Sequence, residues 1–125
     1  MSEKLILIVE DNEKNLKLMR DILQFKGYAT VEATTAEEGV DIAVTSLPEL
    51  ILLDIQLPGM NGIEAMKILK ERQETTDIPV IAVTASVMTH DRHKLIEAGF
   101  DDYQAKPIEI REFLERIEKI FNISS

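Results

Sequence analysis

Short apolar runs alternate with amphipathic stretches along the chain, and this alternation restricts the possible folds more than any other feature. Five runs have the composition of strands: Leu5–Val9, Tyr28–Ala33, Leu50–Leu53, Val80–Val83 and Phe100–Ala105. Each run is followed by a stretch in which apolar residues recur at helical spacing. Such an alternation predicts an α/β fold, in which helices cover both faces of a parallel sheet.

The composition of the runs also predicts their order in the sheet. Leu5–Val9, Leu50–Leu53 and Val80–Val83 are continuously apolar, as expected for strands buried on both faces. Tyr28–Ala33 alternates in character and Phe100–Ala105 contains acids, so these two belong at the edges. A flavodoxin-like, doubly wound sheet of order 2-1-3-4-5 meets this requirement. Right-handed crossovers then place the first and fifth helices on one face and the other three on the opposite face.

Capping residues mark the ends of several predicted helices. The first helix is expected to follow the N-cap Asn12 and to end at Gly27. Thr35–Glu38 has the pattern of a capping box for the second helix, which Pro48 ends. The third helix is expected to follow Asn61–Gly62.

The last two predicted helices differ in how well they are anchored. The fifth shows the clearest helical pattern, with apolar residues recurring from Ile110 to Phe121. The fourth, about Val87–Ala98, has a polar middle without an apolar anchor, from Thr89 to Lys94. We therefore expect the fourth helix to be the loosest.

Charge and composition exclude several classes of protein. The 125 residues, enough for one domain, include 23 Asp and Glu against 14 Lys and Arg, for a net charge of −9. A chain this acidic is a poor ligand for nucleic acid or for an anionic membrane surface. It has no cysteine, and its N-terminal apolar run is too short for a signal peptide or a membrane span. We expect a cytoplasmic protein.

Polar residues stand where four of the predicted strands end. Glu10 and Asp11 follow the first strand, Asp54 the third, Thr84 the fourth and Lys106 the fifth. The carboxyl ends of parallel strands share one edge, where ligands of such sheets bind. We therefore expect the three acids to converge, although each taken alone is also a common turn former or helix cap.

Three converging carboxylates need a cation to offset their repulsion. Oxygen ligands without His or Cys favour Mg²⁺, for which Mn²⁺ could substitute. Lys106 and the Thr84 hydroxyl could bind an anion beside the metal, and one carboxylate could act as a nucleophile. The pattern therefore indicates a phosphoryl site.

Four motifs carry a resemblance to a known family: Ile8–Asn12, Leu52–Gly62, Val80–Ala85 and Lys106–Ile108. In this order, and at strand ends, they resemble the receiver domain of two-component response regulators. The similarity runs from about residue 4 to residue 121, so residues 1–125 are expected to form a single receiver domain. Within the family the chain resembles stand-alone cell-division regulators of the DivK type and the receivers of hybrid kinases.

The resemblance implies a role for each acid. Asp54 matches the phosphoacceptor aspartate. Asp11, Asp54 and the backbone carbonyl of Gln56 match the Mg²⁺ ligands, with Glu10 holding the metal through water.

The resemblance also implies a conformational switch. Lys106 matches the lysine that pairs with the phosphoryl group, and its bond to Pro107 is cis in the family. Thr84 matches the hydroxyl that moves to the phosphoryl group, and Tyr103 matches the aromatic residue that turns inward with it. The poorly anchored fourth helix suits such a change.

The implied donor is a histidine kinase or a histidine phosphotransfer protein. A downstream protein would bind the surface formed by the fourth helix, the fifth strand and the fifth helix. Since the chain ends about four residues after residue 121, output through protein contacts is expected if it is full length. A basic face on the first helix is either a docking surface or an ordinary solvated helix; its residues are Lys14, Lys17, Arg20 and Lys26.

Three other functions fit the sequence less well. A phosphatase with an aspartate nucleophile usually has a second Asp where this chain has Gln56, so we expect no enzyme beyond slow self-dephosphorylation. A flavin module would place a phosphate loop where Glu10 and Asp11 would repel phosphate. A pseudo-receiver that is never phosphorylated would not need the complete set of site residues.

Overall fold

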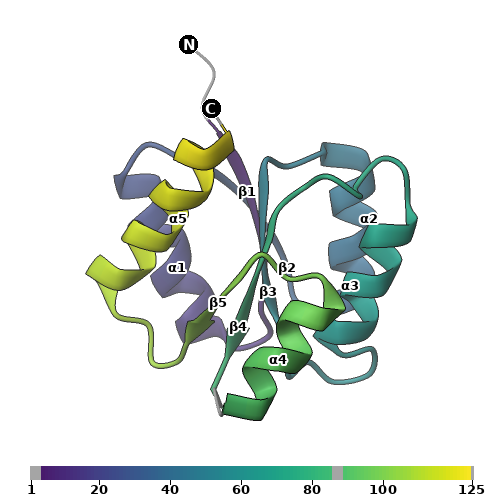
Figure 1. The fold of residues 1–125 in the computed structure, drawn as a ribbon. Coiled ribbons are helices and arrows are strands. Elements are labelled where there is room, and N and C mark those ends of the chain that lie inside the picture. The colour runs from purple at the N-terminus through teal and green to yellow at the C-terminus, as the bar shows by residue number, and fades with distance from the viewer. Residues whose placement is uncertain (1–3, 86–88, 125) are drawn as a thin grey trace.

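A computed structural model describes residues 4–85 and 89–124 and shows one five-stranded parallel sheet of order β2-β1-β3-β4-β5. The strands are β1 (Leu5–Val9), β2 (Ala29–Ala33), β3 (Leu50–Asp54), β4 (Val80–Thr84) and β5 (Asp102–Ala105). The helices are α1 (Glu13–Phe25), α2 (Ala36–Ser46), α3 (Gly62–Glu71), α4 (Thr89–Ala98) and α5 (Ile110–Ser124). Figure 1 shows α1 and α5 on one side of the sheet and α2, α3 and α4 on the other. The predicted fold, strand order and helix placement are confirmed.

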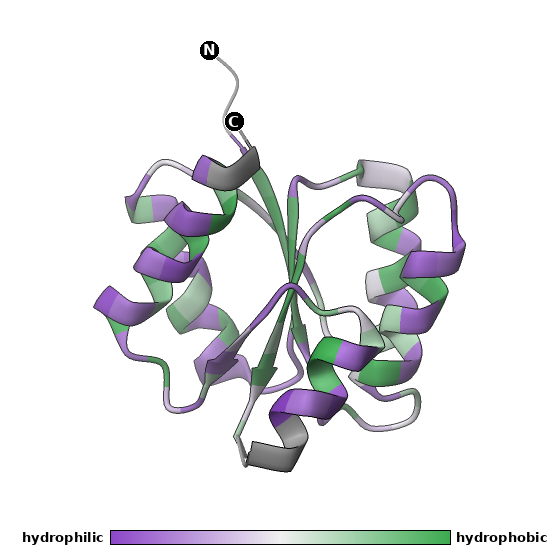
Figure 2. Cartoon of the chain, in the orientation of Figure 1, coloured by the Kyte–Doolittle hydropathy of each residue, from purple (hydrophilic) through white to green (hydrophobic). Residues whose placement is uncertain are grey.

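The sheet is buried on both faces, with one apolar layer on each. Leu7 and Val9 of β1 face the layer formed with α2, α3 and α4, whereas Ile6 and Ile8 face the layer formed with α1 and α5. The alternation follows from the two-residue period of a strand. In Figure 2 the hydrophobic colour accordingly gathers on the central strands, while the helices carry polar residues as well.

Most helix ends follow the capping signals. The side chain of Asn12 accepts a hydrogen bond from the Asn15 amide at the start of α1. Gly27 follows the C-cap of this helix with a φ of +93°, which glycine adopts without steric cost. At α3, Asn61 and Glu64 cap each other's backbone in a complete capping box.

The start of α2 differs in detail from the predicted capping box. Thr35 Oγ1 accepts a hydrogen bond from the Glu38 amide at 3.1 Å, as expected. The Glu38 carboxylate, however, accepts from the amide of Thr34 rather than from that of Thr35. The reciprocal bond therefore lies one residue before the N-cap.

Two strands are shorter than predicted. β5 begins at Asp102, because the Phe100 amide still donates to the Leu95 carbonyl of α4 at 3.1 Å and the Asp101 carboxylate accepts a hydrogen bond from the Val80 amide at 2.8 Å. β2 begins at Ala29, and the ring of Tyr28 packs 5.5 Å from that of Phe121.

The fourth helix follows the expected pattern from Thr89 onward. The predicted start near Val87 lies outside the described residues. Within α4, Leu95 is buried against the core, while Ile96 is more than half exposed.

Candidate functional site

Three carboxylates gather at the carboxyl ends of β1 and β3. Glu10 and Asp11 follow β1 and Asp54 ends β3, and each offers an oxygen within 4.8 Å of the others. The strands are adjacent, with Val9 paired to Leu53, which brings together residues far apart in the sequence. Glu10 is fully buried and Asp54 is 2% exposed, whereas Asp11 faces solvent. The predicted convergence of the acids is thus observed.

Backbone amides orient the two buried carboxylates. The Asn12 amide donates to Glu10 Oε2 at 3.1 Å, and the Gln56 amide donates to Asp54 Oδ1 at 2.8 Å. The Gln56 carbonyl, predicted as a metal ligand, follows directly after this amide, and its role stays a prediction.

Lys106 joins the cluster from the end of β5. Its Nζ lies 3.0 Å from Asp54 Oδ2 and 3.0 Å from Glu10 Oε1. The Lys106 backbone amide donates to the carbonyl of Thr84 at 2.8 Å, which ties the lysine to the end of β4. The bond between Lys106 and Pro107 is cis, as the resemblance implies.

The electrostatics of the cluster favour a bound cation. Burial, together with a hydrogen bond to Asp54, raises the pKa of Glu10 from 4.5 to about 7, although Lys106 and the Asn12 amide act in the opposite direction. Burial alone would lower the pKa of Lys106, but hydrogen bonds to Glu10 and Asp54 outweigh it and raise this pKa. Lys106 therefore stays charged, and one positive charge faces three carboxyl groups.

The two predicted switch residues lie on β4 and β5. Thr84 is buried at the end of β4, next to Ala105 of β5. Tyr103 is half-buried, and the guanidinium groups of both Arg92 and Arg116 contact its ring. Thr84 therefore lies at the edge that carries the acids, while Tyr103 reaches toward α4 and α5.

The two arginines beside Tyr103 were not found by sequence reasoning. The only signal available was the spacing of Glu112 and Arg116, which suits an ion pair on one helix. Nothing in the sequence pattern links either arginine to Tyr103.

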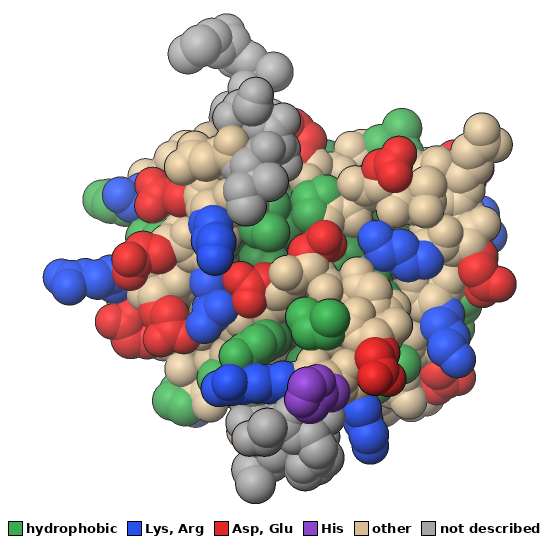
Figure 3. All heavy atoms as spheres, viewed as in Figure 1, with side chains coloured by type: hydrophobic (Ala, Val, Ile, Leu, Met, Phe, Trp, Pro, Cys, Tyr) green, Lys and Arg blue, Asp and Glu red, His purple; other side chains and the backbone are tan. Residues whose placement is uncertain are grey.

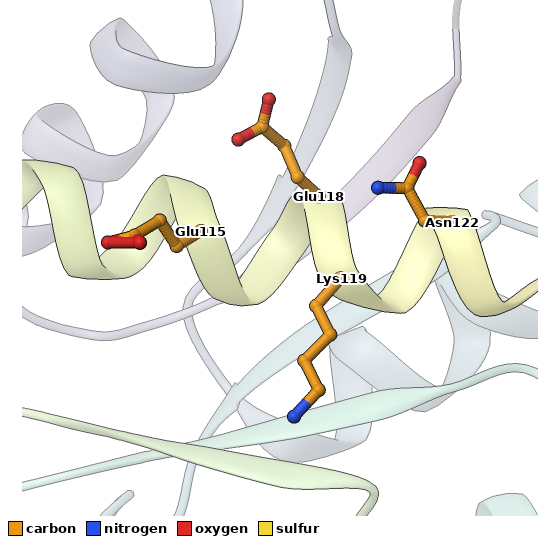
Figure 4. A pocket seen from close by; sticks show the side chains of 4 residues that line it. All are labelled: Glu115, Glu118, Lys119 and Asn122. Atoms are coloured by element: carbon orange, nitrogen blue, oxygen red, sulfur yellow. The ribbon is translucent and has the colours of Figure 1, made fainter.

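Two other hollows of the described surface do not form a comparable site. One lies on α5 beside Glu115, Glu118, Lys119 and Asn122. Figure 4 shows Glu118 and Asn122 on one side of the helix and Lys119 on the other, so these groups do not converge. A second groove, between α1 and α5, is apolar and includes the exposed Phe25 and Ile110.

The face formed by α4, β5 and α5 carries charges of both signs. Figure 3 shows Lys and Arg side chains mixed with Asp and Glu around apolar side chains on this face.

Among the helices of the described residues, none has the length and apolar character needed to cross a membrane.

Comparisons with known proteins agree with this geometry. Residues 6–118 match the model of the response regulator receiver domain. The polar-differentiation response regulator DivK of Brucella ovis is 44% identical over 115 residues, which cover 92% of this chain and 94% of that protein.

Solved structures of receiver domains have the same fold. A CheY-like response regulator receiver domain protein from Methanospirillum hungatei superposes with a TM-score of 0.87 at 34% identity, covering 97% of this chain and 96% of that one. The receiver domain of the sensor histidine kinase PA1611 from Pseudomonas aeruginosa, which has a magnesium ion coordinated in its active-site cleft, gives a TM-score of 0.89. It is 28% identical and covers 97% of this chain and 99% of its own.

Proposed function

The chain belongs to the family of response regulator receiver domains, and on this premise we propose that it accepts a phosphoryl group on Asp54 from a phosphohistidine donor. The observation that carries the proposal is the contact of buried Asp54 with Lys106, beside two further carboxylates. Receiver domains of response regulators generally interact with histidine kinases or phosphotransfer proteins and with downstream targets. For this chain, the donor is proposed to be one of these two classes.

The residues of the cluster fit Mg²⁺. Three carboxylates with oxygens within 4.8 Å form the hard donor set that this ion prefers. Asp11, Asp54 and the Gln56 carbonyl would hold the ion, and Glu10 would contribute through water. Bound there, Mg²⁺ would supply positive charge beside the transferred phosphoryl group. The magnesium site of the Pseudomonas relative supports this assignment.

The side chains of the site assist the transfer in separate ways. An oxygen of Asp54 attacks the phosphorus, the bond from phosphorus to the histidine nitrogen breaks, and its electron pair stays on the imidazole. The product is an acyl phosphate on Asp54 and a free histidine that takes a proton from solvent. The amide of Gln56, 2.8 Å from Asp54 Oδ1, orients the nucleophile. Lys106 pairs with the negative phosphoryl oxygens.

Phosphorylation would then shift a conformational equilibrium. The new phosphoryl oxygens attract the Thr84 hydroxyl, which ends β4 directly before the segment leading to α4. Tyr103 follows this movement, and the surface of α4, β5 and α5 changes for a downstream protein. The protein acts in this proposal as a phosphorylated signal and not as a turnover enzyme. A phosphatase assay on small substrates should show only slow self-dephosphorylation.

The test is labelling of Asp54 by radioactive acetyl phosphate or a phosphohistidine protein, with and without Mg²⁺. The wild-type protein should incorporate label only with Mg²⁺, and Asp54→Asn should incorporate none. Asp21→Asn, which removes an exposed acid of α1, is the matched control and should label normally. Full labelling of the Asp54→Asn protein would disprove the assignment.

A further inference from the structure

Two arginines from different helices contact the ring of Tyr103 on β5. The guanidinium carbon of Arg92, on α4, lies 5.4 Å from the ring centroid, and that of Arg116, on α5, lies 5.3 Å from it. Both distances are within the range of about 6 Å at which a guanidinium is attracted to an aromatic face. Figure 1 shows the edge strand β5 between these two helices. The ring therefore links α4 to α5 across the edge of the sheet.

Acidic side chains fix the position of Arg116. Its Nη1 donates to Asp102 Oδ1 at 2.9 Å, and its Nη2 donates to Glu112 Oε1 at 3.0 Å. Asp102 Oδ1 also accepts a hydrogen bond from the Tyr103 amide at 2.8 Å. One carboxylate thus holds both the arginine and the backbone of the tyrosine that the arginine contacts.

Arg92 provides the link to α4. This helix is mostly polar, and among its described side chains, those of residues 92–98, Leu95 is the one buried against the core. The contact of Arg92 with Tyr103 therefore matters for how firmly α4 is held against β5. Because Arg92 is exposed, we expect its contact to be weaker than that of Arg116, which two acids anchor.

Both contacts occur in the arrangement in which Lys106 pairs directly with Asp54 and Glu10. If Tyr103 turns inward when Asp54 is phosphorylated, the movement would take its ring away from the two guanidinium groups that contact it from α4 and α5. We infer that Arg92 and Arg116 are positioning residues that hold Tyr103 in the resting arrangement and thereby set how readily the protein switches. The inference rests on the proposed function, because it concerns the switch that phosphorylation would operate.

The expected effect follows from the strength of such contacts. A cation–π contact at an exposed site changes a two-state equilibrium by about two- to fivefold. Two contacts that are lost together should change it by about four- to twenty-five-fold, the product of the two single effects. Removing the arginines should therefore lower the concentration of an activating ligand needed for half-maximal switching by these factors.

Tyrosine fluorescence can report this switch at a single residue. The chain has two tyrosines and no tryptophan, so Tyr28→Phe leaves Tyr103 as the remaining emitter. In this parent protein, emission is followed during titration with beryllofluoride, a mimic of the phosphoryl group, at fixed Mg²⁺. Arg92→Gln and Arg116→Gln should each lower the midpoint about two- to fivefold, and the double variant about four- to twenty-five-fold.

Two further sets of variants separate ring contact from charge and from folding. Arg20→Gln also removes an arginine that is paired with an acid, Glu32, and should leave the midpoint unchanged. Replacing Arg92 and Arg116 together by Lys keeps both charges but removes the flat guanidinium, and should give an intermediate midpoint. Thermal unfolding shows which variants are folded. If the Gln double variant does not fold, the midpoint of the Lys double variant is the one compared with the parent protein.

The outcomes distinguish this inference from the proposed function. A parent protein whose emission does not respond to beryllofluoride and Mg²⁺ contradicts the switch itself, and the inference with it. A parent that responds, with variants whose midpoints are unchanged or raised, contradicts only the role of the arginines. The role of the arginines is supported if the midpoint is lowest in the Gln double variant, intermediate in the Lys double variant and highest in the parent protein.

Discussion

Lys106 Nζ lies 3.0 Å from Asp54 Oδ2, although 52 residues separate the two in the sequence. The contact arises because β5 and β3 end at the same edge of the sheet, with β4 between them. It places a permanent positive charge against the oxygen that we propose as the phosphoryl acceptor. The same charge lies where it would repel a metal cation bound to the acids. Lys106 should therefore favour binding of the phosphoryl group and weaken binding of the metal ion.

Replacing Lys106 by Gln should therefore separate the two effects. Labelling of Asp54 by acetyl phosphate should fall by roughly tenfold or more, because the phosphoryl group loses a charged partner. Mg²⁺ should bind more tightly, because a competing cation is gone, and calorimetric titration can measure this. Lys67→Gln, on an exposed position of α3, is the control. A Lys106→Gln protein that labels at the wild-type rate would contradict the role of the lysine.

Much of the fold could be predicted because it depends on composition that is local in the sequence. The continuous apolar character of Leu50–Leu53 and Val80–Val83 placed them inside the sheet, and the structure confirms this. The start of β5 was missed because it depends on a contact between distant residues. The Asp101 side chain caps the Val80 amide, and no local pattern shows that pairing.

The candidate site likewise has one part that could be predicted from the sequence and one part that could not. Its acids and Lys106 could be predicted because strand ends converge in any sheet of this topology. The surroundings of Tyr103 could not, because Arg92 and Arg116 reach it from two helices whose packing angles the sequence pattern does not determine. The Gln56 carbonyl as a ligand stays a prediction.

The pH dependence of stability should reveal the buried Glu10 in metal-free protein. Its pKa of about 7 in the folded state exceeds the ordinary value of 4.5, so the folded state binds a proton more tightly than the unfolded state. The resulting stabilisation is complete below pH 4.5 and is lost as the pH rises through 7. Relative to Glu10→Gln, the wild-type protein should therefore lose up to about 3 kcal/mol of unfolding free energy over this range.

Urea unfolding in EDTA at several pH values measures this difference. The Gln variant keeps the shape of the side chain but cannot ionise, so the comparison cancels the titration of other groups. A difference between the two proteins that does not change with pH would show that Glu10 titrates normally. Adding Mg²⁺ should reduce the difference at high pH, because the ion offsets the ionised carboxylate.

Replacing Thr84 tests the coupling between the phosphoryl site and Tyr103. Thr84→Val keeps the branched shape in this buried position but removes the hydroxyl, whereas Thr84→Ser keeps the hydroxyl and removes a methyl group. Both proteins should still be labelled on Asp54. Only Thr84→Ser should retain the beryllofluoride response of Tyr103 fluorescence in the Tyr28→Phe background. If the Val variant responds like the wild-type protein, the hydroxyl does not carry the signal.

Gly62, at the start of α3, should be required for the geometry of Asp54. A Cβ added there would lie 2.5 Å from the Cα of Ile55 and 2.8 Å from the backbone oxygen of Asp54. Backbone atoms cannot yield as a flexible side chain does, so Gly62→Ala should displace the segment after β3. We expect a loss of roughly 1–3 kcal/mol in unfolding free energy and slower labelling of Asp54.

Gly27→Ala is the matched control for this substitution. Gly27 has a φ of +93° and nothing within 4 Å of an added Cβ, so the same change costs backbone strain without a clash. The Gly27→Ala protein should lose stability but should label at the wild-type rate once the folded fraction is taken into account. Gly27 precedes the start of β2, at the edge of the parallel sheet opposite to the one where β3 ends with Asp54. Equal labelling rates for both folded variants would show that the close approach of Gly62 stabilises the fold without positioning the phosphoacceptor.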